Sequence, residues 1–267
     1  KPFFKIGIFV LTLMLEIKII KCLEDNYSYL LKDKKTNLVA VVDPSEFKAV
    51  DEEINKNYKK LDFILNTHHH FDHVGGNLQL KTKYNAKVVC SAYDQNKVPG
   101  ADIKKRDNDY FIFGETKFKV IHVPGHTLDH IVFFSETDKV LFSGDTLFSL
   151  GCGRVFEGSY EQMFNSLEKI KELPKSTKIY CGHEYTKNNA KFCTKIDKDN
   201  LKLKKRVKDV TNKTNLEEPT IPITLKEEIE TNTFLRYDIN KIKKTLELDN
   251  ASKVEVFKKL RILKDQF

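Results

Sequence analysis

Tryptophan is absent from the 267-residue sequence, and cysteine is scarce. The cysteines are odd in number and form no Cys-x-x-Cys pair; they are Cys22, Cys90, Cys152, Cys181 and Cys193. This usage argues against a disulfide framework and favours a reducing compartment. Long apolar runs are also lacking, because the run within KPFFKIGIFVLTLM at the amino terminus is too short to span a bilayer. We therefore expect a cytoplasmic protein without a membrane partner.

Residues 1–13 allow several interpretations. The stretch is basic and apolar, and the first methionine is Met14. It is a leader left from a targeting segment, sequence upstream of a start at Met14, or an extra N-terminal segment such as an edge strand. The first of these would place the protein in an organelle, a mitochondrion or a plastid.

The basic charge is not accompanied by a nucleic-acid-binding motif. The formal net charge is +8 and the isoelectric point is near 9.0, but the lysines are scattered along the chain. We interpret most of them as a solvated surface, and a small carboxylated ligand as the anionic partner. The contents of 40% hydrophobic and 31% charged residues are ordinary for a globular protein. We predict no nucleic-acid partner.

The first two thirds of the chain have the pattern of short strands. Runs rich in β-branched and aromatic residues alternate there with turn residues. The runs are LEIKIIKCL, NYSYLLK, NLVAVVD, LDFILNT, AKVVCSA, YFIFG, TKFKVIHVPG, HIVFFSE, KVLFSGD and TKIYCG. Helices are predicted over residues 47–58, 77–84 and 159–173, the last with Ser159 and Gln162 as a capping box.

Beyond Gly182 the strand patterns end and helical periodicity dominates. Lysine and glutamate become dense, as in NLKLKKRVKDV, TLKEEIETNTFLR and ASKVEVFKKLRILKD. We place a domain boundary near residue 185. The predicted organisation is a catalytic domain over residues 14–185 and a smaller α-helical domain over residues 186–267.

The stretch NTHHHFDHVGGN, residues 66–77, concentrates residues that bind metals. His68 and His70 are two positions apart, so in an extended chain they point to the same side while His69 points away. Asp72 and His73 follow directly. The spacing lacks the i, i+4 pattern of helical ligands, and it predicts a strand end that runs into a loop.

Other predicted strands also end at a histidine or an aspartate. His126 follows KVIHVPG, Asp145 ends KVLFSGD, and His183 follows TKIYCG. Because sites in α/β proteins gather at strand ends, we expect these side chains to meet the histidine cluster. Together they exceed what one tetrahedral ion can bind, and they suit two ions that share a carboxylate and activate a water. His69 and His122 are left out, and His130 is interpreted as a residue that orients a ligand.

These motifs resemble those of a known superfamily. THHHFDH resembles the THxHxDH signature of the metallo-β-lactamase superfamily, and VPGHT, SGDTLF and CGHEYT resemble its other motifs. Within it, DNYSYLL, GDTLFSLGCGRVFEGS, CGHEYTKNNAKF and LRILKDQF resemble glyoxalase II, the hydroxyacylglutathione hydrolases, over roughly residues 15–267. The resemblance implies an α/β fold: a metallo-β-lactamase αββα sandwich followed by a smaller helical C-terminal domain.

The resemblance also implies how the metal ligands are divided. The first ion would be bound by His68, His70 and His126. The second would be bound by Asp72, His73 and His183, with Asp145 bridging the two. We expect two divalent ions, zinc first, with iron or manganese as alternatives. Asp72 and Asp145 would be the catalytic carboxylates, acting with a hydroxide that bridges the ions.

Substrate contacts are implied in the same way. In the resembled family, glutathione is bound by residues matching Arg154, Tyr185, Arg261 and Lys264. Their types suit the two carboxylates of glutathione. Phe156 stands where the family often has a hydroxylated aromatic residue, so we expect one hydrogen bond to the ligand to be missing.

The expected activity is hydrolysis of S-(2-hydroxyacyl)glutathione thioesters by a monomer, with S-D-lactoylglutathione giving D-lactate and glutathione in the second step of methylglyoxal detoxification. Cys152 and Cys181 lie near the site in sequence but are given no nucleophilic role. Three alternatives stay open at this stage: a single-iron persulfide dioxygenase, another hydrolase of the superfamily such as a nuclease, and a basic binding module without metal.

Overall fold

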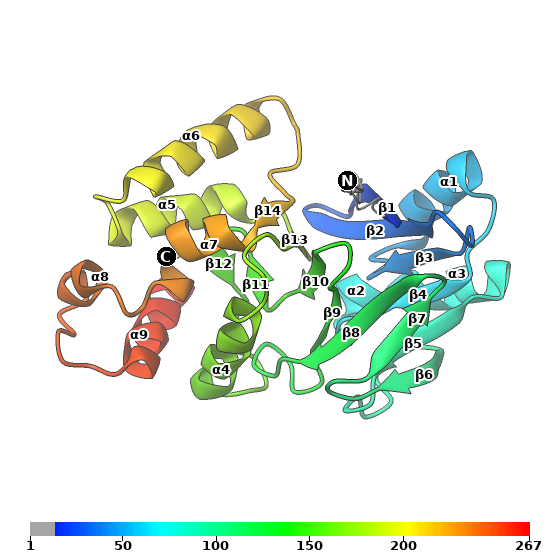
Figure 1. Ribbon diagram of the computed structural model, residues 1–267, viewed down its shortest axis with the longest axis horizontal. Coiled ribbons are helices and arrows are strands. Elements are labelled where there is room, and N and C mark those ends of the chain that lie inside the picture. The colour runs from blue at the N-terminus through cyan, green and yellow to red at the C-terminus, as the bar shows by residue number, and fades with distance from the viewer. Residues whose placement is uncertain (1–13) are drawn as a thin grey trace, which may run out of the picture.

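The computed structural model describes residues 14–267, and two mixed sheets pack face to face in it (Figure 1). The predicted leader or extra segment at residues 1–13 lies outside the described residues. The first sheet has the order β1-β2-β3-β4-β5-β6. Its strands are β1 (Leu15–Cys22), β2 (Asn26–Asp33), β3 (Val39–Val42), β4 (Phe63–Leu65), β5 (Lys87–Ser91) and β6 (Ala101–Lys105).

The second sheet has the order β14-β13-β10-β9-β8-β7. Its strands are β7 (Tyr110–Phe113), β8 (Thr116–His122), β9 (Ile131–Ser135), β10 (Val140–Gly144), β13 (Lys178–Cys181) and β14 (Ile223–Thr224). A separate two-stranded hairpin joins β11 (Leu147–Phe148) to β12 (Gly151–Cys152). Strand β13 pairs with β10 in parallel, so both strands deliver their carboxyl ends to the same edge.

Helices cover the outer faces of both sheets. Against the first sheet lie α1 (Phe47–Asn57) and α3 (Asn77–Tyr84), and the short α2 (Phe71–Val74) lies between them in sequence. Helix α4 (Tyr160–Lys171) and the C-terminal helices cover the second sheet. The latter are α5 (Thr186–Ile196), α6 (Leu201–Asn215), α7 (Leu225–Thr231), α8 (Asn240–Thr245) and α9 (Lys253–Asp265), with a 3₁₀ turn, η1 (Thr233–Leu235). The predicted αββα sandwich with a helical C-terminal part is confirmed.

The core between the sheets contains many aromatic residues together with aliphatic ones. Tyr29 from the first sheet packs on Phe142 from the second, with ring centroids 5.4 Å apart. Phe113, Phe118 and Phe133 are fully buried in the same cluster. Such large side chains keep two sheets at the usual spacing and remove much apolar surface from water.

Four short elements differ from the sequence prediction. Strand β6 was not predicted, because its residues alternate between exposed and half-buried and carry no apolar signature. Hairpin β11–β12 and strand β14 are only two residues per strand. Strand β14 pairs with β13 from within the region predicted to be helical. The predicted capping box of α4 is confirmed, with Gln162 N donating to Ser159 Oγ at 3.1 Å and Ser159 N to Gln162 Oε1 at 2.8 Å.

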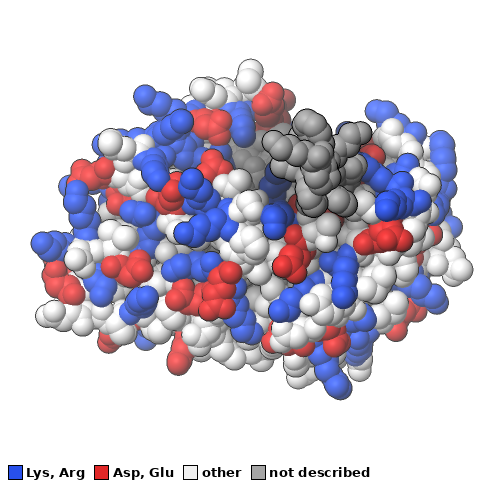
Figure 2. Space-filling view, in the orientation of Figure 1, with Lys and Arg blue, Asp and Glu red and all other residues white. Residues whose placement is uncertain are grey.

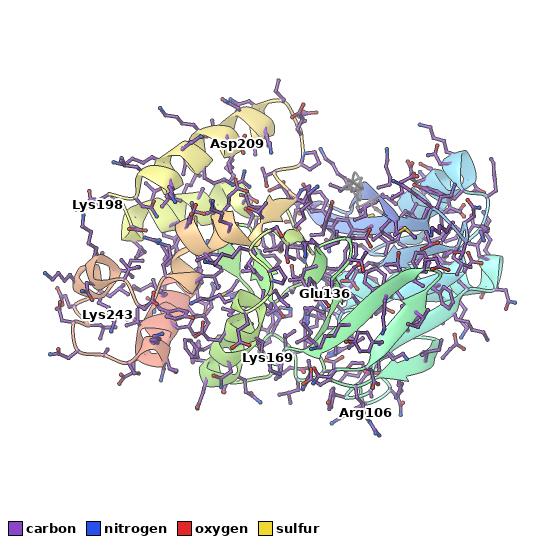
Figure 3. All side chains as sticks on the ribbon, viewed as in Figure 1. Arg106, Glu136, Lys169, Lys198, Asp209 and Lys243 are labelled. Atoms are coloured by element: carbon purple, nitrogen blue, oxygen red, sulfur yellow. The ribbon has the colours of Figure 1, made fainter. Side chains whose placement is uncertain are left out.

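The basic charge is dispersed over the surface. Figure 2 shows Lys and Arg side chains spread across this face of the molecule and interleaved with Asp and Glu. In Figure 3, Arg106, Lys169, Lys198 and Lys243 project from separate elements rather than from one patch. This distribution fits a solvated surface in which opposite charges lie side by side.

Candidate metal centre and substrate cleft

The structure brings together all seven residues predicted as metal ligands. They come from four places in the chain: the segment after β4 with helix α2, and the ends of the segments that follow β8, β10 and β13. The stretch at residues 68–73 is partly helical, because α2 begins at Phe71. The prediction of a strand end running into a loop was therefore incomplete: a single helical turn places Asp72 and His73 beside each other in the site.

The first group of ligand atoms is made of three imidazoles. His70 Nδ1 lies 3.1 Å from His68 Nε2 and 3.0 Å from His126 Nε2. Around a tetrahedral ion with bonds of about 2.0–2.1 Å, neighbouring ligand atoms lie roughly 3.3 Å apart. These three nitrogens therefore have the spacing of one coordination sphere, and they form one of the candidate metal groups in the described residues.

The second group contains one carboxylate and two imidazoles. His183 Nε2 lies 3.3 Å from both His73 Nε2 and Asp72 Oδ2. Asp72 Oδ2 is 3.7 Å from His73 Nε2. This group also has the spacing of ligands around a single ion.

Asp145 stands between the two groups. Its Oδ2 is 3.4 Å from His126 Nε2 in the first group and 3.3 Å from His183 Nε2 in the second. Its Oδ1 is 3.3 Å from His73 Nε2 and is buried without a hydrogen-bond partner. A buried carboxylate oxygen of this kind is costly unless something satisfies it. The residues present therefore fit two cations that share Asp145.

The electrostatics of the site also favour cations. Burial lowers the pKa of His68 well below its usual value and that of His70 to about 4, so both imidazoles are neutral and have a free lone pair. Burial also lowers the pKa of His183, but the Asp145 carboxylate outweighs it and raises that pKa to about 10. Positive charge is thus favoured beside Asp145, and a divalent ion supplies it while leaving the imidazoles neutral.

Each histidine whose Nε2 faces the site has a partner for its other ring nitrogen. The partners are Thr67 Oγ1 for His68 at 3.0 Å, Asp43 Oδ2 for His73 at 3.0 Å, the Arg154 carbonyl for His126 at 2.8 Å, and Asp25 Oδ1 for His183 at 2.8 Å. Asn26 Nδ2 donates to Asp72 Oδ2 at 3.0 Å. Such partners fix the ring orientation and leave Nε2 free to bind a metal.

Sequence reasoning missed Asp25, Asn26 and Asp43. Asp43 ends the apolar run NLVAVVD just as Asp145 ends KVLFSGD, so its position was a usable signal. Asp25 and Asn26 carry no such signal. They reach the site because Asn26 forms an isolated antiparallel bridge with His183, a contact between residues far apart in sequence.

The three remaining histidines lie outside the two groups. His130 is buried, and its Nε2 accepts the backbone N–H of Asp145 at 3.1 Å, as expected of an orienting residue. His122 ends β8 and bonds the Leu128 carbonyl at 2.9 Å. His69 Nδ1 lies 2.8 Å from Asp129 Oδ1.

Two further candidate metal groups are present among the described residues: one combines Asp43 with the ligands His68 and His73, and the other combines His69 with Asp94 and Asp129. The second of these lies apart from the seven ligands. Lys97 already supplies a cation beside it, with its Nζ 3.4 Å from His69 Nε2 and 3.0 Å from Glu157 Oε1. We therefore interpret this group as a charge network on the outer side of the histidine stretch.

A cleft of about 250 Å³ lies next to the second metal group. It is lined by Phe148, Cys152, Arg154, Tyr185, Asn188, Asn189, Arg261, Lys264 and Asp265. Tyr185 connects it to the metal centre, because its ring stacks on His183 with centroids 4.6 Å apart and planes 5° from parallel. All four residues predicted to bind glutathione through charge or a hydroxyl group thus line one cleft beside the ligands of the second ion.

Within the cleft, Arg154 and Arg261 have different surroundings. The Arg154 side chain is 57% exposed and lies against Asp265, with Nε 3.2 Å from Oδ1. Arg261 is 4% exposed; its Nη1 donates to the Cys152 carbonyl at 2.7 Å and its Nη2 to Asp265 Oδ1 at 2.9 Å. The contacts of Arg261 are made within the protein, and its role as a direct ligand of glutathione stays a prediction.

Phe156 lies over the first metal group. Its ring centroid is 5.2 Å from that of His126 and 5.8 Å from that of His70, and the ring is 60% exposed. The guanidinium of Arg154 lies 6.0 Å from its centroid. An apolar ring therefore forms the open side of the site, and its effect on ligand affinity stays a prediction.

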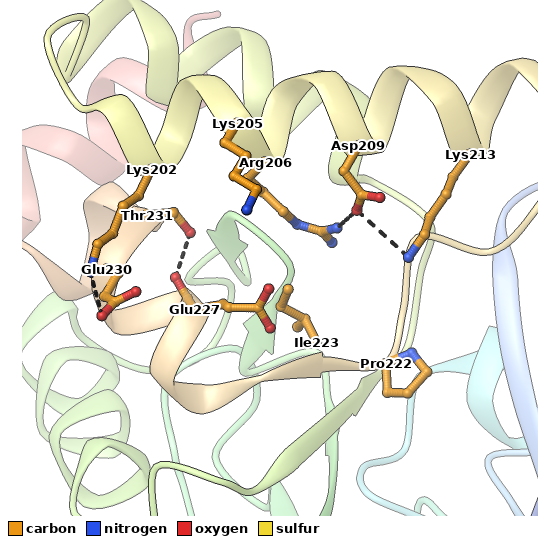
Figure 4. A pocket seen from close by; sticks show the side chains of 10 residues that line it. All are labelled: Lys202, Lys205, Arg206, Asp209, Lys213, Pro222, Ile223, Glu227, Glu230 and Thr231. Carbon is orange, nitrogen blue, oxygen red and sulfur yellow. Dashed lines mark hydrogen bonds and ion pairs between the residues drawn. The ribbon is translucent and has the colours of Figure 1, made fainter.

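A further cleft, of about 630 Å³, lies between α6 and the β14–α7 segment, away from the metal ligands (Figure 4). Its charges are largely paired: Lys202 Nζ lies 2.7 Å from Glu230 Oε1, and Asp209 lies 2.5 Å from Arg206 and 3.6 Å from Lys213. Paired charges at a surface contribute little to ligand binding, so we do not assign a site there.

Comparison with known protein families gives two matches that together cover most of the chain. Residues 24–183 match the metallo-beta-lactamase superfamily, and residues 184–267 match the hydroxyacylglutathione hydrolase C-terminus. A curated relative from Pelagibacter ubique, a hydroxyacylglutathione hydrolase, is 50% identical over 95% of this chain and 100% of its own length. A relative of the same name from Methylococcus capsulatus is 45% identical over 95% of this chain and 99% of its own.

The chain belongs to the hydroxyacylglutathione hydrolase family of the metallo-β-lactamase superfamily. The predicted family is therefore confirmed.

Solved structures agree with the fold. ETHE1 from Myxococcus xanthus aligns with a TM-score of 0.65 at 23% identity, over 91% of this chain and 95% of that one. The di-iron-bound form of TTHA1623 aligns with a TM-score of 0.51 at 25% identity, over 59% of this chain and 87% of that one. The superfamily fold implies a dinuclear metal site, and the described residues contain His and Asp groups that could hold metal ions. Among the described residues, no helix is both long and apolar enough to cross a bilayer.

Proposed function

We propose that this chain hydrolyses S-(2-hydroxyacyl)glutathione thioesters, with S-D-lactoylglutathione giving D-lactate and glutathione in the second step of methylglyoxal detoxification. The observation that carries the proposal is the stacking of Tyr185 on His183, because it joins a cleft that holds the exposed Arg154 and the half-buried Lys264 to the group of metal ligands. The names of the curated relatives support the same activity.

Two divalent ions are the proposed cofactor, and zinc is the proposed metal, with iron or manganese as alternatives. The ligand set of imidazoles and carboxylates accepts any of these ions. Bound there, the pair of ions would lower the pKa of a water from 15.7 towards ~7 and polarise the thioester carbonyl. The proposed ligands are His68, His70 and His126 for one ion, and Asp72, His73 and His183 for the other, with Asp145 shared.

The protein's own residues would orient the substrate and the water. We assign Arg154 and Lys264 to the carboxylates of glutathione, because guanidinium and ammonium groups pair with carboxylates. Tyr185, 38% exposed, would offer its hydroxyl at the boundary between cleft and metal centre. Asp72 and Asp145 would orient the attacking water, and Asn26 keeps Asp72 in place through a hydrogen bond of 3.0 Å.

No cysteine of the site is proposed as a nucleophile. Burial raises the pKa of Cys152 to about 11 and that of Cys181 to about 12, so both are thiols at neutral pH. The leaving glutathione thiolate, with a pKa of about 8.5 for an ordinary thiol, departs without a dedicated general acid.

Hydrolysis assays would test the proposed activity. Protein loaded with two metal equivalents should release thiol from S-D-lactoylglutathione, with a kcat/KM at least tenfold above that for a lactoyl thioester of N-acetylcysteamine, which lacks the glutathione carboxylates. Lys264→Glu should raise KM for the glutathione thioester about tenfold with little change in kcat. Lys259→Glu, the same charge reversal at an exposed position of α9 outside the cleft, is the matched control.

Two results would contradict the proposal. Full metal occupancy without thioester hydrolysis would reject the activity, and oxygen consumption with glutathione persulfide would point to a persulfide dioxygenase instead. A fall in kcat alone in Lys264→Glu would reject the substrate-binding role of this residue.

We also propose that residues 186–267 act as the substrate-binding domain and residues 14–185 as the catalytic domain, that the protein works as a monomer, and that it is cytoplasmic. The meeting of the two family matches at residues 183 and 184 supports the division. The cysteines support a reducing compartment, because all five are buried and free.

A further inference from the structure

The turn that connects hairpin strands β11 and β12 is strained and closely confined. We use the name 149–153 turn for residues 149 to 153, which comprise the two connecting residues, strand β12 and Gly153. They lie between Asp145 and Arg154 in sequence. Leu150 is fully buried and has φ of 58°, a left-handed conformation that is unfavourable for a leucine. At Gly153, an added Cβ would lie 1.9 Å from the Asp145 carbonyl oxygen. Such a conformation persists only where the surroundings hold it in place.

A buried carboxylate from helix α7 holds the strained residue. Glu228 is fully buried, and its two carboxylate oxygens lie 3.0 and 3.2 Å from the backbone N of Leu150, which donates to them. Asn232 Nδ2 donates to Glu228 Oε2 at 2.8 Å and to the Gly151 carbonyl at 3.0 Å. The Glu228–Asn232 pair thus satisfies an N–H and a C=O of adjacent residues in the turn.

Burying the Glu228 carboxylate costs free energy. We therefore interpret its contact with the Leu150 N–H as a feature with a function. Burial raises the pKa of Glu228 to about 7, and the hydrogen bond from Asn232 and the positive charge of Arg206 offset this only in part. An apolar side chain at this position of α7 would avoid the desolvation of a carboxylate but would leave the Leu150 N–H unpaired. The buried Glu228 therefore lowers the stability of the fold, and in return it maintains the left-handed backbone conformation at Leu150.

Other helices of the C-terminal part bind the same turn. Arg206 of α6, seen in Figure 4, donates from Nη2 to Ser149 Oγ at 3.1 Å. Asn189 of α5 donates from Nδ2 to the Ser149 carbonyl at 3.1 Å. Arg261 of α9 donates to the Cys152 carbonyl at 2.7 Å. Side chains from four helices thus converge on the 149–153 turn.

The 149–153 turn shapes the proposed substrate cleft. Phe148, Cys152 and Arg154, which lie in or beside it, line one wall of the cleft, whereas Glu228 and Asn232 do not line it. At the metal end, the Arg154 carbonyl bonds His126 Nδ1 at 2.8 Å and so anchors the backbone there independently of Glu228. Movement at Leu150 would therefore displace the wall of the cleft more than the metal ligands.

We propose that Glu228 is a positioning residue for glutathione binding: through the Leu150 N–H and Asn232 it fixes the 149–153 turn, and the turn places the Arg154 side chain in the cleft. The inference rests on the proposed function. The C-terminal helices then have two roles. They contact the substrate, and they set the conformation of the 149–153 turn, which belongs to the αββα sandwich.

The variant Glu228→Gln tests the proposal. Glutamine keeps the size of the side chain but places an NH₂ where Leu150 N–H or Asn232 NH₂ needs an acceptor. The dissociation constant for S-methylglutathione, measured by calorimetry, and KM for S-D-lactoylglutathione should both rise about tenfold. The kcat should stay within twofold, and the metal content should be unchanged. Glu230→Gln makes the same substitution on the same helix and should leave all four quantities as they are.

A double-mutant cycle separates positioning from a general loss of structure. In an Arg154→Gln background, Glu228→Gln should raise the dissociation constant less than twofold further, because the residue through which it acts is already gone. Equal, multiplicative losses in both backgrounds would overturn the proposal, and so would an unchanged dissociation constant in the single variant.

A measurement on the unaltered protein covers the case in which Glu228→Gln does not fold. The Leu150 amide should exchange hydrogen slowly, and more slowly still with S-methylglutathione bound. Rapid exchange that the ligand does not alter would overturn the proposal. Should the unaltered protein bind S-methylglutathione but hydrolyse no glutathione thioester, the proposed function fails while the positioning role remains testable by binding.

Discussion

Asp43 is one of the residues beyond the seven ligands that contact the second metal group directly. Its Oδ2 accepts from His73 Nδ1 at 3.0 Å and from Thr67 Oγ1 at 2.7 Å, and its Oδ1 accepts the Thr67 N–H at 2.8 Å. The same carboxylate thus orients a ligand and holds the backbone just before His68. Asp43 contacts His73 directly and reaches His68 only through Thr67, so its loss should affect the second ion more than the first.

We predict that Asp43→Asn weakens binding of the second metal ion about 10- to 100-fold and that of the first ion less, as is usual when the partner of a ligating histidine is lost. Titration of metal-free protein against a chromophoric chelator would measure the two affinities. Asp102→Asn is the matched control, because Asp102 lies on the edge strand β6, where it pairs with Lys81 of α3. Equal weakening of both ions, or of neither, would contradict the assignment of His73.

The seven candidate ligands could be predicted from sequence because each follows a recognisable apolar strand and has a suitable chemical type. Asp25 could not be predicted, because nothing in the turn after β1 indicates that it will meet His183 Nδ1 at 2.8 Å. The placement of Arg261 could not be predicted either. Its spacing from Lys264 indicates a shared helix face, but only the packed structure shows that its guanidinium is directed at the Cys152 carbonyl.

At the scale of elements, Asp33 joins the end of β2 to the β7–β8 hairpin of the other sheet. Its Oδ1 accepts from the N–H groups of Lys35 and Thr36 at 3.1 and 2.8 Å. Its Oδ2 accepts from the N–H groups of Glu115 and Thr116, both at 3.1 Å. The buried Asp33 carboxylate thus stabilises the turn after β2 and the turn between β7 and β8, and it connects the two sheets.

We predict that Asp33→Asn lowers the free energy of unfolding at pH 7 by about 2–4 kcal/mol, because backbone donors lose an acceptor. Burial alone would raise the pKa of Asp33, but the hydrogen bonds from the Thr36 turn and Thr116 lower it below 3.8. The stabilisation is therefore present above about pH 4 and is lost as the pH falls through the lower, folded-state pKa. Urea denaturation from pH 7 to pH 3 should show the difference shrinking.

The exposed Glu136, labelled in Figure 3, provides the control for that series. Glu136→Gln removes the same charge from a turn of the second sheet and should change the free energy of unfolding by less than about 0.5 kcal/mol. A similar loss in both variants would show that net charge rather than the Asp33 contacts is responsible.

Two of the elements that sequence reasoning missed, α2 and β14, have a common cause. Helix α2 has four residues and β14 two, which is too short for any periodic pattern to develop. Their conformations are set by tertiary contacts: His73 N bonds the His70 carbonyl at 2.9 Å inside the site, and β14 pairs with β13. Longer elements such as α4 and α9 carry both periodicity and caps, and these were predicted to within a few residues.

At the scale of the whole molecule, the candidate metal centre connects the two sheets. His68, His70, Asp72 and His73 follow β4 of the first sheet, whereas Asp145 and His183 follow β10 and β13 of the second. Ions bound to both sets would cross-link the sandwich at this edge. Since metal binding to the folded state adds directly to its stability, metal content should govern how the entire fold unfolds.

We predict that a chelator lowers the thermal unfolding midpoint by roughly 10–20 °C, because each ion at 100 times its dissociation constant contributes about 2.7 kcal/mol and each kcal/mol shifts a chain of this size by roughly 2–4 °C. Differential scanning calorimetry with and without EDTA would measure the shift. Asp145→Asn removes the shared ligand and should abolish most of the response. His122→Gln changes a histidine outside both groups and should keep it. If EDTA shifted Asp145→Asn as strongly as the unaltered protein, the stabilising metal would be bound somewhere other than between the two sheets.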